Sequence, residues 1–353
     1  MALRRRTLLT TAAAVPLAAT AGCTDRFGDE TNARDPPAYA RWVPATSPGT
    51  EGTYFVYLDW SGTGDLEALG DVPGGDTLFG MASFGIMVTG YSNAILESYV
   101  FEDTPGGGGA TTDVETSDPA TGRDLGTIET SLLCGAAVIL EGEFDLDTVE
   151  AAASDEGFER AGTHQGSRIY EGRSFDRDLA FAARADALVF GSHGLLSFGP
   201  HDAAQNADVT VRSIVDRSLD VEAGDRQRMA DRSNDAEWAV ASAGHGQIAL
   251  GAWGQFAEGS PFNDLIEASR FGNAAGATAV PIPQPTGEVY SLSPEKPAPS
   301  GDMAAAYPDG SVPDRETVAA AVGDGAHEQD IEIDDGRVSV SATWHIPTGT
   351  ESS

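Results

Sequence analysis

The chain has 353 residues, of which 41% are hydrophobic, enough to build a packed core in one large domain or two small ones. It carries 55 acidic against 21 basic residues, a formal net charge of −34, and Lys296 is its only lysine. A surface of this charge repels nucleic acid, so no nucleic-acid partner is expected. The acidity would suit a site for cations. We interpret it instead as a means of staying soluble in concentrated salt, where the Debye length falls to about 3 Å and self-repulsion is screened.

Residues 1–22 have the features of an export signal. Arg5 and Arg6 are followed by a short apolar stretch over 7–21 that carries no charge, which is the pattern of a twin-arginine signal peptide. A helix needs about 20 apolar residues to span a hydrocarbon core, so this stretch is too short to be a membrane span. It ends in Thr20-Ala21-Gly22-Cys23, which resembles the lipobox of exported lipoproteins.

Cys23 is therefore predicted to accept a lipid and to become the new N-terminus of the mature protein. The alternative is an N-terminal anchor that is never cleaved, and both interpretations attach the chain to the outer face of the cell membrane. Residues 23–50 are polar and contain several prolines, so we predict a tether between the anchor and the body.

The body is predicted to be an α+β domain over residues 51–270. Its expected elements are a strand over 54–60, a buried apolar segment over 78–101, a strand over 136–142, a helix over 146–154, hairpins that turn at 165–166 and 184–186, a helix over 209–219, and two paired strands over 239–243 and 247–253. Asp145 stands at the N-cap position of the first helix. The segment 78–101 contains glycines and Glu97 and lacks flanking basic residues, which favours a core position over a membrane span.

The C-terminal part repeats this order of elements. Residues 271–300 are rich in proline and predict an extended linker or an edge segment. Residues 301–347 then give a strand over 303–307, a helix over 314–322 and a hairpin turning at Asp335-Gly336 between alternating apolar residues. We predict two related strand–helix–hairpin halves, the second packed on the body. The expected fold is an α+β antiparallel sheet with helices packed on one face.

The sequence contains no motif that assigns an enzymatic reaction. It lacks a nucleophile elbow, a phosphate-binding loop, a dinucleotide fingerprint and a zinc HExxH pair. His193 and His201 could approach each other beside Asp202, but a metal site needs three or four convergent ligands, and we interpret them as solvated loop histidines. The acidic residues over 330–335 lack the spacing of a calcium loop and are better explained as the outer face of a strand. We expect no catalytic residue, no metal and no cofactor.

The two cysteines have different expected roles. If Cys23 carries lipid, Cys134 has no partner for a disulfide. Cys134 lies in an apolar run, and a free cysteine in such surroundings is commonly a small buried hydrophobic residue.

Four short segments carry a resemblance to known proteins. They are Phe144–Val149, Gly157-Phe158, Ile169–Glu171 and Ala187–Gly191. Together with the signal, they resemble a pattern in uncharacterised haloarchaeal lipoproteins that are exported by the twin-arginine route, and the similarity covers mainly residues 134–219. The resemblance implies the compartment, the fold and folding before export. It brings no catalytic residues.

The function expected from these observations is that of a noncatalytic cell-surface lipoprotein, either a binding module or a component of the envelope. The alternative is an extracytoplasmic hydrolase whose site is assembled from scattered residues. A solute-binding protein is a third hypothesis, but the pattern does not show the two large lobes with parallel strands that such proteins have.

Overall fold

The structure is a computed structural model of the whole chain. It describes residues 35–48, 51–61, 78, 115–118, 123–174, 177–192, 209–255, 283–294, 298–308, 310–323 and 325–345. Arg5, Arg6, Cys23, His193 and His201 lie outside these residues, as does all of the apolar segment 78–101 except Leu78. None of the helices in the described part of the chain combines the length and the apolar character that crossing a membrane requires.

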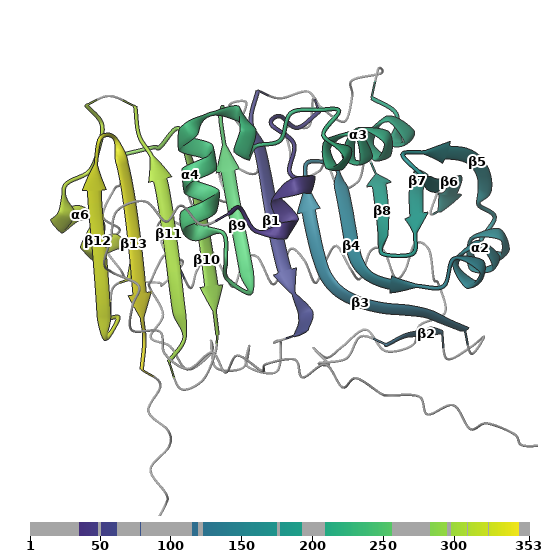
Figure 1. Cartoon of the computed structure of the whole chain (residues 1–353), viewed down its shortest axis with the longest axis horizontal. Coiled ribbons are helices and arrows are strands. Elements are labelled where there is room, and N and C mark those ends of the chain that lie inside the picture. Colours follow the sequence, from purple (N-terminus) through teal and green to yellow (C-terminus); the bar gives the residue numbers. More distant parts are fainter. Residues whose placement is uncertain are drawn as a thin grey trace, which may run out of the picture. The chain divides into compact units, whose positions relative to one another are not determined.

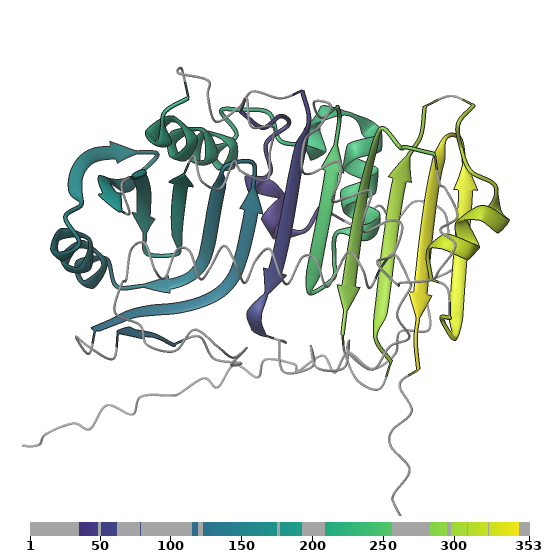
Figure 2. The same ribbon diagram turned by 180° about the vertical axis from the view of Figure 1, so that it is seen from behind.

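The fold is an open antiparallel sheet with helices, as the sequence predicts (Figures 1 and 2). Thirteen strands are described, in the order β12-β13-β11-β10-β9-β1-β3-β4-β8-β7-β6-β5, with β2 paired to β3 beside this path. Their bounds are β1 Thr53–Asp59, β2 Glu115–Asp118, β3 Arg123–Cys134, β4 Ala137–Phe144, β5 Glu159–His164, β6 Ser167–Ser174, β7 Arg177–Arg184, β8 Ala187–Ser192, β9 Ile248–Trp253, β10 Gly287–Ser293, β11 Ser300–Ala306, β12 Glu328–Asp334 and β13 Arg337–Thr343. The helical elements are η1 Ala38–Trp42, α2 Leu146–Asp155, α3 Val211–Ala223, η5 Ala230–Arg232, α4 Asn234–Ala243 and α6 Arg315–Ala321.

Strand β1 lies in the middle of the sheet and pairs on both of its edges. Val56 stands opposite Leu133 of β3 and opposite Leu250 of β9. Both faces of β1 are buried, since Phe55, Val56 and Leu58 are each 1% exposed. A strand that is buried on both faces reads as a continuous apolar run, which explains the composition of this segment.

The side chains of the strands form one apolar cluster on each face of the sheet. The sequence predicts helices on one face only, but the strands pack against η1, α3 and α4 on just one of the two faces. On the other face they pack with Leu78 and with residues of α2 and α6, including Val149 and Val318. The sheet is therefore a central layer with apolar contacts on both sides, and the helices divide between the two sides (Figures 1 and 2).

Polar side chains set where the helices begin. Asp145 accepts hydrogen bonds from the backbone N–H groups of Asp147 and Thr148, as predicted. Thr210, Ser233 and Asp314 cap α3, α4 and α6 in the same manner. Each cap satisfies N–H groups that have no partner within the helix, which is worth about 1 kcal/mol.

The predicted hairpin turns are also present. Asp335 and Gly336 connect β12 and β13 with positive φ angles of 45° and 84°. Gln165 and Gly166 connect β5 and β6 with angles of 46° and 79°. Two consecutive positive φ angles match the twist of the flanking strands, which is why an Asp-Gly pair predicts such a turn well.

The structure corrects the predicted tether. Residues 35–48 are not a loose arm, because η1 packs on the sheet and Trp42 is 0% exposed. Trp42 donates a hydrogen bond from Nε1 to Glu141 Oε1 at 2.9 Å, and the guanidinium groups of Arg41 and Arg184 lie over its ring at 5.9 and 5.5 Å. Arg41 forms an ion pair with Glu141. An aromatic side chain that is held in this way anchors the segment to the body.

Two further predictions are wrong. The linker or edge segment predicted over 271–300 contains β10, which is an interior strand paired with both β9 and β11. Its prolines flank the strand, so every N–H of β10 is free to join the sheet. The strand predicted over 239–243 is instead the second half of α4, because Ser233 caps this helix and its alanines face the core.

The two predicted halves are parts of one sheet. Strand β11 pairs with β10, so the C-terminal segment extends the sheet rather than packing on it as a separate body. The order strand, helix, hairpin occurs in β4-α2-β5-β6 and again in β11-α6-β12-β13. Their common origin stays a prediction, because within the described residues the β7–β8 hairpin has a place in the first set and no counterpart in the second.

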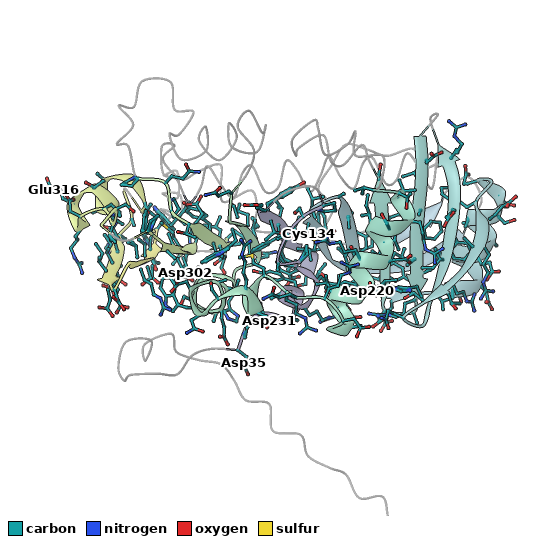
Figure 3. All side chains as sticks on the ribbon, turned by 90° about the horizontal axis from the view of Figure 1, so that it is seen from above. Asp35, Cys134, Asp220, Asp231, Asp302 and Glu316 are labelled. Atoms are coloured by element: carbon teal, nitrogen blue, oxygen red, sulfur yellow. The ribbon has the colours of Figure 1, made fainter. Side chains whose placement is uncertain are left out.

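Cys134 is buried in the sheet as a free thiol (Figure 3). Burial raises the pKa of this thiol to about 12. Since the thiolate is the reactive species, we expect a Cys23→Ala variant, whose single cysteine is Cys134, to resist iodoacetamide while folded and to be alkylated when unfolded. Mass spectrometry after timed labelling measures this. Complete alkylation of the folded protein would contradict the buried position.

Candidate functional site

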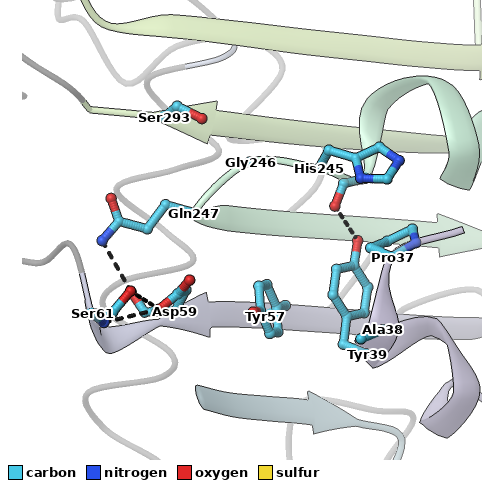
Figure 4. Close-up of a pocket in the computed structure, with 11 residues that line it drawn as sticks. Pro37, Ala38, Tyr39, Tyr57, Asp59, Ser61, His245, Gly246, Gln247 and Ser293 are labelled. Carbon is cyan, nitrogen blue, oxygen red and sulfur yellow. Dashed lines mark hydrogen bonds between the residues drawn. The ribbon is translucent and has the colours of Figure 1, made fainter. Parts of the chain in front are cut away.

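A polar groove of about 430 Å³ opens where η1, β1, the α4–β9 connection and the end of β10 meet. These elements are far apart in the sequence and lie next to one another in the structure (Figures 1 and 4). The lining residues are Pro37, Ala38, Tyr39, Tyr57, Asp59, Ser61, Gly244, His245, Gly246, Gln247 and Ser293. Small-molecule sites are concave and combine aromatic side chains with a few placed polar groups, and this groove offers both.

Two stacked tyrosines form one wall of the groove. The rings of Tyr39 and Tyr57 lie 4.3 Å apart with an interplanar angle of 22°. Tyr39 is buried and donates a hydrogen bond from its hydroxyl to the carbonyl oxygen of Gly244 at 2.9 Å (Figure 4). Tyr57 is half-buried, so part of its ring borders the groove. The buried tyrosine thus fixes the position of the accessible one.

Asp59 lies at the end of β1, and its position is held by hydrogen bonds. Its Oδ1 accepts bonds from the backbone N–H of Ser61 at 2.9 Å and from the Ser61 hydroxyl at 2.6 Å. Its backbone oxygen accepts a bond from Gln247 Nε2 at 3.0 Å, which ties β1 to the start of β9 (Figure 4). Among the described residues, Asp59 Oδ2 has no hydrogen-bond partner and remains available to a ligand.

The groove has a negative electrostatic environment. Asp59 stands opposite Thr130 of β3, which in turn stands opposite Glu141 of β4, so the two carboxylates lie along one row of the sheet. Burial, together with the charges of Asp59 and Glu141, raises the pKa of Tyr57 well above its ordinary value. The described lining contains no lysine and no arginine. Nearby Arg41 is already paired with Glu141 and, at 3.7 Å, with Glu222.

A histidine–carboxylate pair lies elsewhere, between the β5–β6 hairpin and α3. His164 Nε2 is 2.7 Å from Asp220 Oδ1. The other oxygen of this carboxylate accepts a bond from Arg226 Nε at 3.3 Å, and Gln165 also donates to Asp220. Burial raises the pKa of Asp220, but these hydrogen bonds outweigh it and hold the pKa below its ordinary value. In the described part of the chain no hydroxyl or thiol is hydrogen-bonded to His164, and the pair links the β5–β6 hairpin to α3.

No metal centre emerges from the described residues. Within them, no three His, Cys, Asp or Glu side chains are grouped closely enough to hold an ion. The acidic side chains of β12 are exposed on alternate positions of an edge strand, as the sequence predicts, while Ile331 between them is buried. Exposed acids of this kind discourage pairing with another sheet edge.

The described lining of this groove contains none of the site residues that the sequence singled out. Arg5, Arg6 and Cys23 lie outside the described residues. The groove joins side chains as far apart in sequence as Asp59 and Gln247, a separation of 188 residues. No short motif could have indicated them. The one local signal was His245, placed between Gly244 and Gly246 in the sequence.

Comparisons with known proteins leave the function open. The chain matches no protein-family model and no curated protein. Among solved structures, crystal form III of TP0453 is similar at 10% identity over 88% of this chain and 94% of that chain, with a TM-score of 0.41. Crystal form I gives 10% identity, 90% and 95% coverage and a TM-score of 0.39. Structural similarity of this degree does not indicate a function for this chain.

The Asp220 pair gives a prediction for stability against pH. Because its folded pKa is lowered, Asp220 adds stability that is present above the unfolded pKa of about 3.9 and is lost as pH falls through the folded pKa. We expect Asp220→Asn to lower the free energy of unfolding by about 1–3 kcal/mol at pH 7, a loss that shrinks below pH 4. Denaturant titrations at several pH values measure it. The control is the exposed Asp231→Asn, and equal losses in both variants would contradict the role of the pair.

Proposed function

We propose that this chain is a noncatalytic, lipid-anchored protein of the outer face of the cell membrane, and that it binds a small polar ligand in the groove beside β1. The observation that carries this proposal is the construction of the groove. Its wall is fixed by the bond from Tyr39 to Gly244, and its floor by the bonds that join Asp59 to Ser61 and Gln247. A site that is already ordered loses little conformational entropy when a ligand binds.

The same bonds argue for binding rather than catalysis. The Ser61 hydroxyl donates to Asp59, and no described histidine is hydrogen-bonded to it, so within the described residues Ser61 lacks a base positioned to activate a serine nucleophile. Tyr57 has a raised pKa and stays protonated in the physiological range, so it is a poor base. The described lining offers one carboxylate, whereas carboxylate-based hydrolysis uses two.

The proposed anchor gives a test based on matched variants. We expect Cys23→Ala to release the protein from membranes into the medium, while Cys134→Ala stays membrane-bound, because Cys23 is the proposed lipid acceptor. We expect replacement of Arg5 and Arg6 by lysine to block export, while Arg4→Lys leaves it unchanged. Cell fractionation and intact-mass spectrometry of the membrane extract measure both effects. Membrane retention of Cys23→Ala without lipid would show that the N-terminal segment is an uncleaved anchor.

The binding role is tested with polar metabolites. The full-length protein is dialysed in concentrated KCl against a cell extract, and retained compounds are identified by mass spectrometry. We expect the wild type to retain at least one unaltered compound that Ser293→Trp does not retain, because tryptophan adds bulk to the lining. The control is Ser339→Trp on β13, outside the groove. Retention that is equal in all three proteins would contradict the groove, and conversion of a compound to product would instead favour the hydrolase alternative.

A further inference from the structure

We propose that the ligand of this groove is a small organic cation with a substituted ammonium group. This inference rests on the proposed binding function and narrows it to one chemical class. Three features of the groove support it: an available carboxylate oxygen, an accessible aromatic ring and a lining without basic side chains that are permanently charged.

The carboxylate supplies the charge that a cation requires. Asp59 Oδ1 accepts two hydrogen bonds from Ser61, and Asp59 Oδ2 has no hydrogen-bond partner among the described residues. Glu141 lies two strands away in the same row and is partly neutralised by Arg41, whose guanidinium is shared between Glu141 and Glu222. With histidine counted as neutral, the one formal charge of the described lining is that of Asp59, and an anionic ligand would meet repulsion without a compensating guanidinium or ammonium group.

The aromatic wall supplies the second contact. One face of Tyr57 stacks on Tyr39, and the half-buried ring of Tyr57 borders the groove. The face of a tyrosine attracts a cation through the ring quadrupole, and the attraction is stronger where water is partly excluded. Burial and the charges of Asp59 and Glu141 raise the pKa of Tyr57, and these two negative charges have the sign that attracts a neighbouring cation.

Other ligand classes fit less well. A bare metal ion needs several convergent ligands, and the described lining gives it one carboxylate. A neutral sugar is recognised by many hydrogen bonds. Here the Ser61 hydroxyl proton and one of the two Gln247 amide protons are engaged with Asp59, which leaves fewer donors for a sugar. An ammonium with alkyl substituents needs only the carboxylate and the ring.

The test uses choline and its neutral isostere 3,3-dimethylbutan-1-ol, in which carbon replaces the charged nitrogen. Binding to the full-length protein is measured by equilibrium dialysis in concentrated KCl, where long-range attraction is screened and contact pairs persist. We expect saturable choline binding, and binding of the isostere that is at least about tenfold weaker, since a single contact between opposite charges is worth this much.

Variants locate the site. We expect Asp59→Asn to weaken choline binding about tenfold or more. Asp330→Asn makes the same change in net charge on the edge strand β12 and is expected to leave binding unchanged. Tyr57→Phe keeps the ring and is expected to bind choline like the wild type, whereas Tyr57→Leu loses binding. Circular dichroism confirms that each variant is folded, and the Asp59→Asn result decides the matter if Tyr57→Leu fails to fold.

The failures can be told apart. Equal binding of choline and its isostere, equal losses in Asp59→Asn and Asp330→Asn, or no choline binding at all would overturn the cation inference. If choline fails while a neutral metabolite is retained and is lost in Ser293→Trp, the inference is wrong and the proposed binding function stands. If no compound is retained through the groove, both are wrong.

Discussion

The pairing of β1 on both of its edges is the interaction on which the rest of the structure depends. Strands β3 to β8 continue the sheet from one edge of β1, and β9 to β13 continue it from the other. A strand in this position can be stable only if both of its faces are covered, because each exposed apolar face would cost hydrophobic free energy. The apolar clusters on the two sides of the sheet meet this need, and Trp42 closes one of them by holding η1 against it.

The same strand creates the groove. Alternation along β1 places Phe55, Tyr57 and Asp59 on one face, and the helices cover Phe55 fully and Tyr57 only in part. Beyond the edge of this cover the face becomes polar, and Gln247 ties Asp59 to β9. The negative net charge of the chain adds to this local field, although salt screens the distant charges and leaves contact partners as the main influence. The proposed binding in the groove would therefore depend on a few neighbouring side chains.

Local features of the fold were predictable, because neighbouring residues determine them. Asp145 caps α2 as predicted, and Asp335-Gly336 forms the predicted turn, since both depend on backbone geometry within four residues. Predictions failed where they relied on the amino-acid composition of a segment, because composition does not show which distant residues the segment contacts. The prolines near β10 suggested a linker, although β10 is a paired strand. The polar composition of residues 23–50 suggested a tether, although this segment contains η1, whose Trp42 is completely buried. Burial of that ring depends on partners more than ninety residues away, such as Glu141 at a separation of 99.

The sequence by itself determined the α+β class, the antiparallel pairing of hairpins, the first helix cap and the isolated buried thiol of Cys134, because these follow from short-range periodicity, turn chemistry and the count of cysteines. It also supports the proposed export signal and the lipid on Cys23. Only the tertiary structure decided that both halves form one sheet through β1, and that Tyr57, Asp59 and Gln247 share a groove. The physical reason is that pairing between distant strands depends on which faces are buried together, and this information is spread over the whole chain.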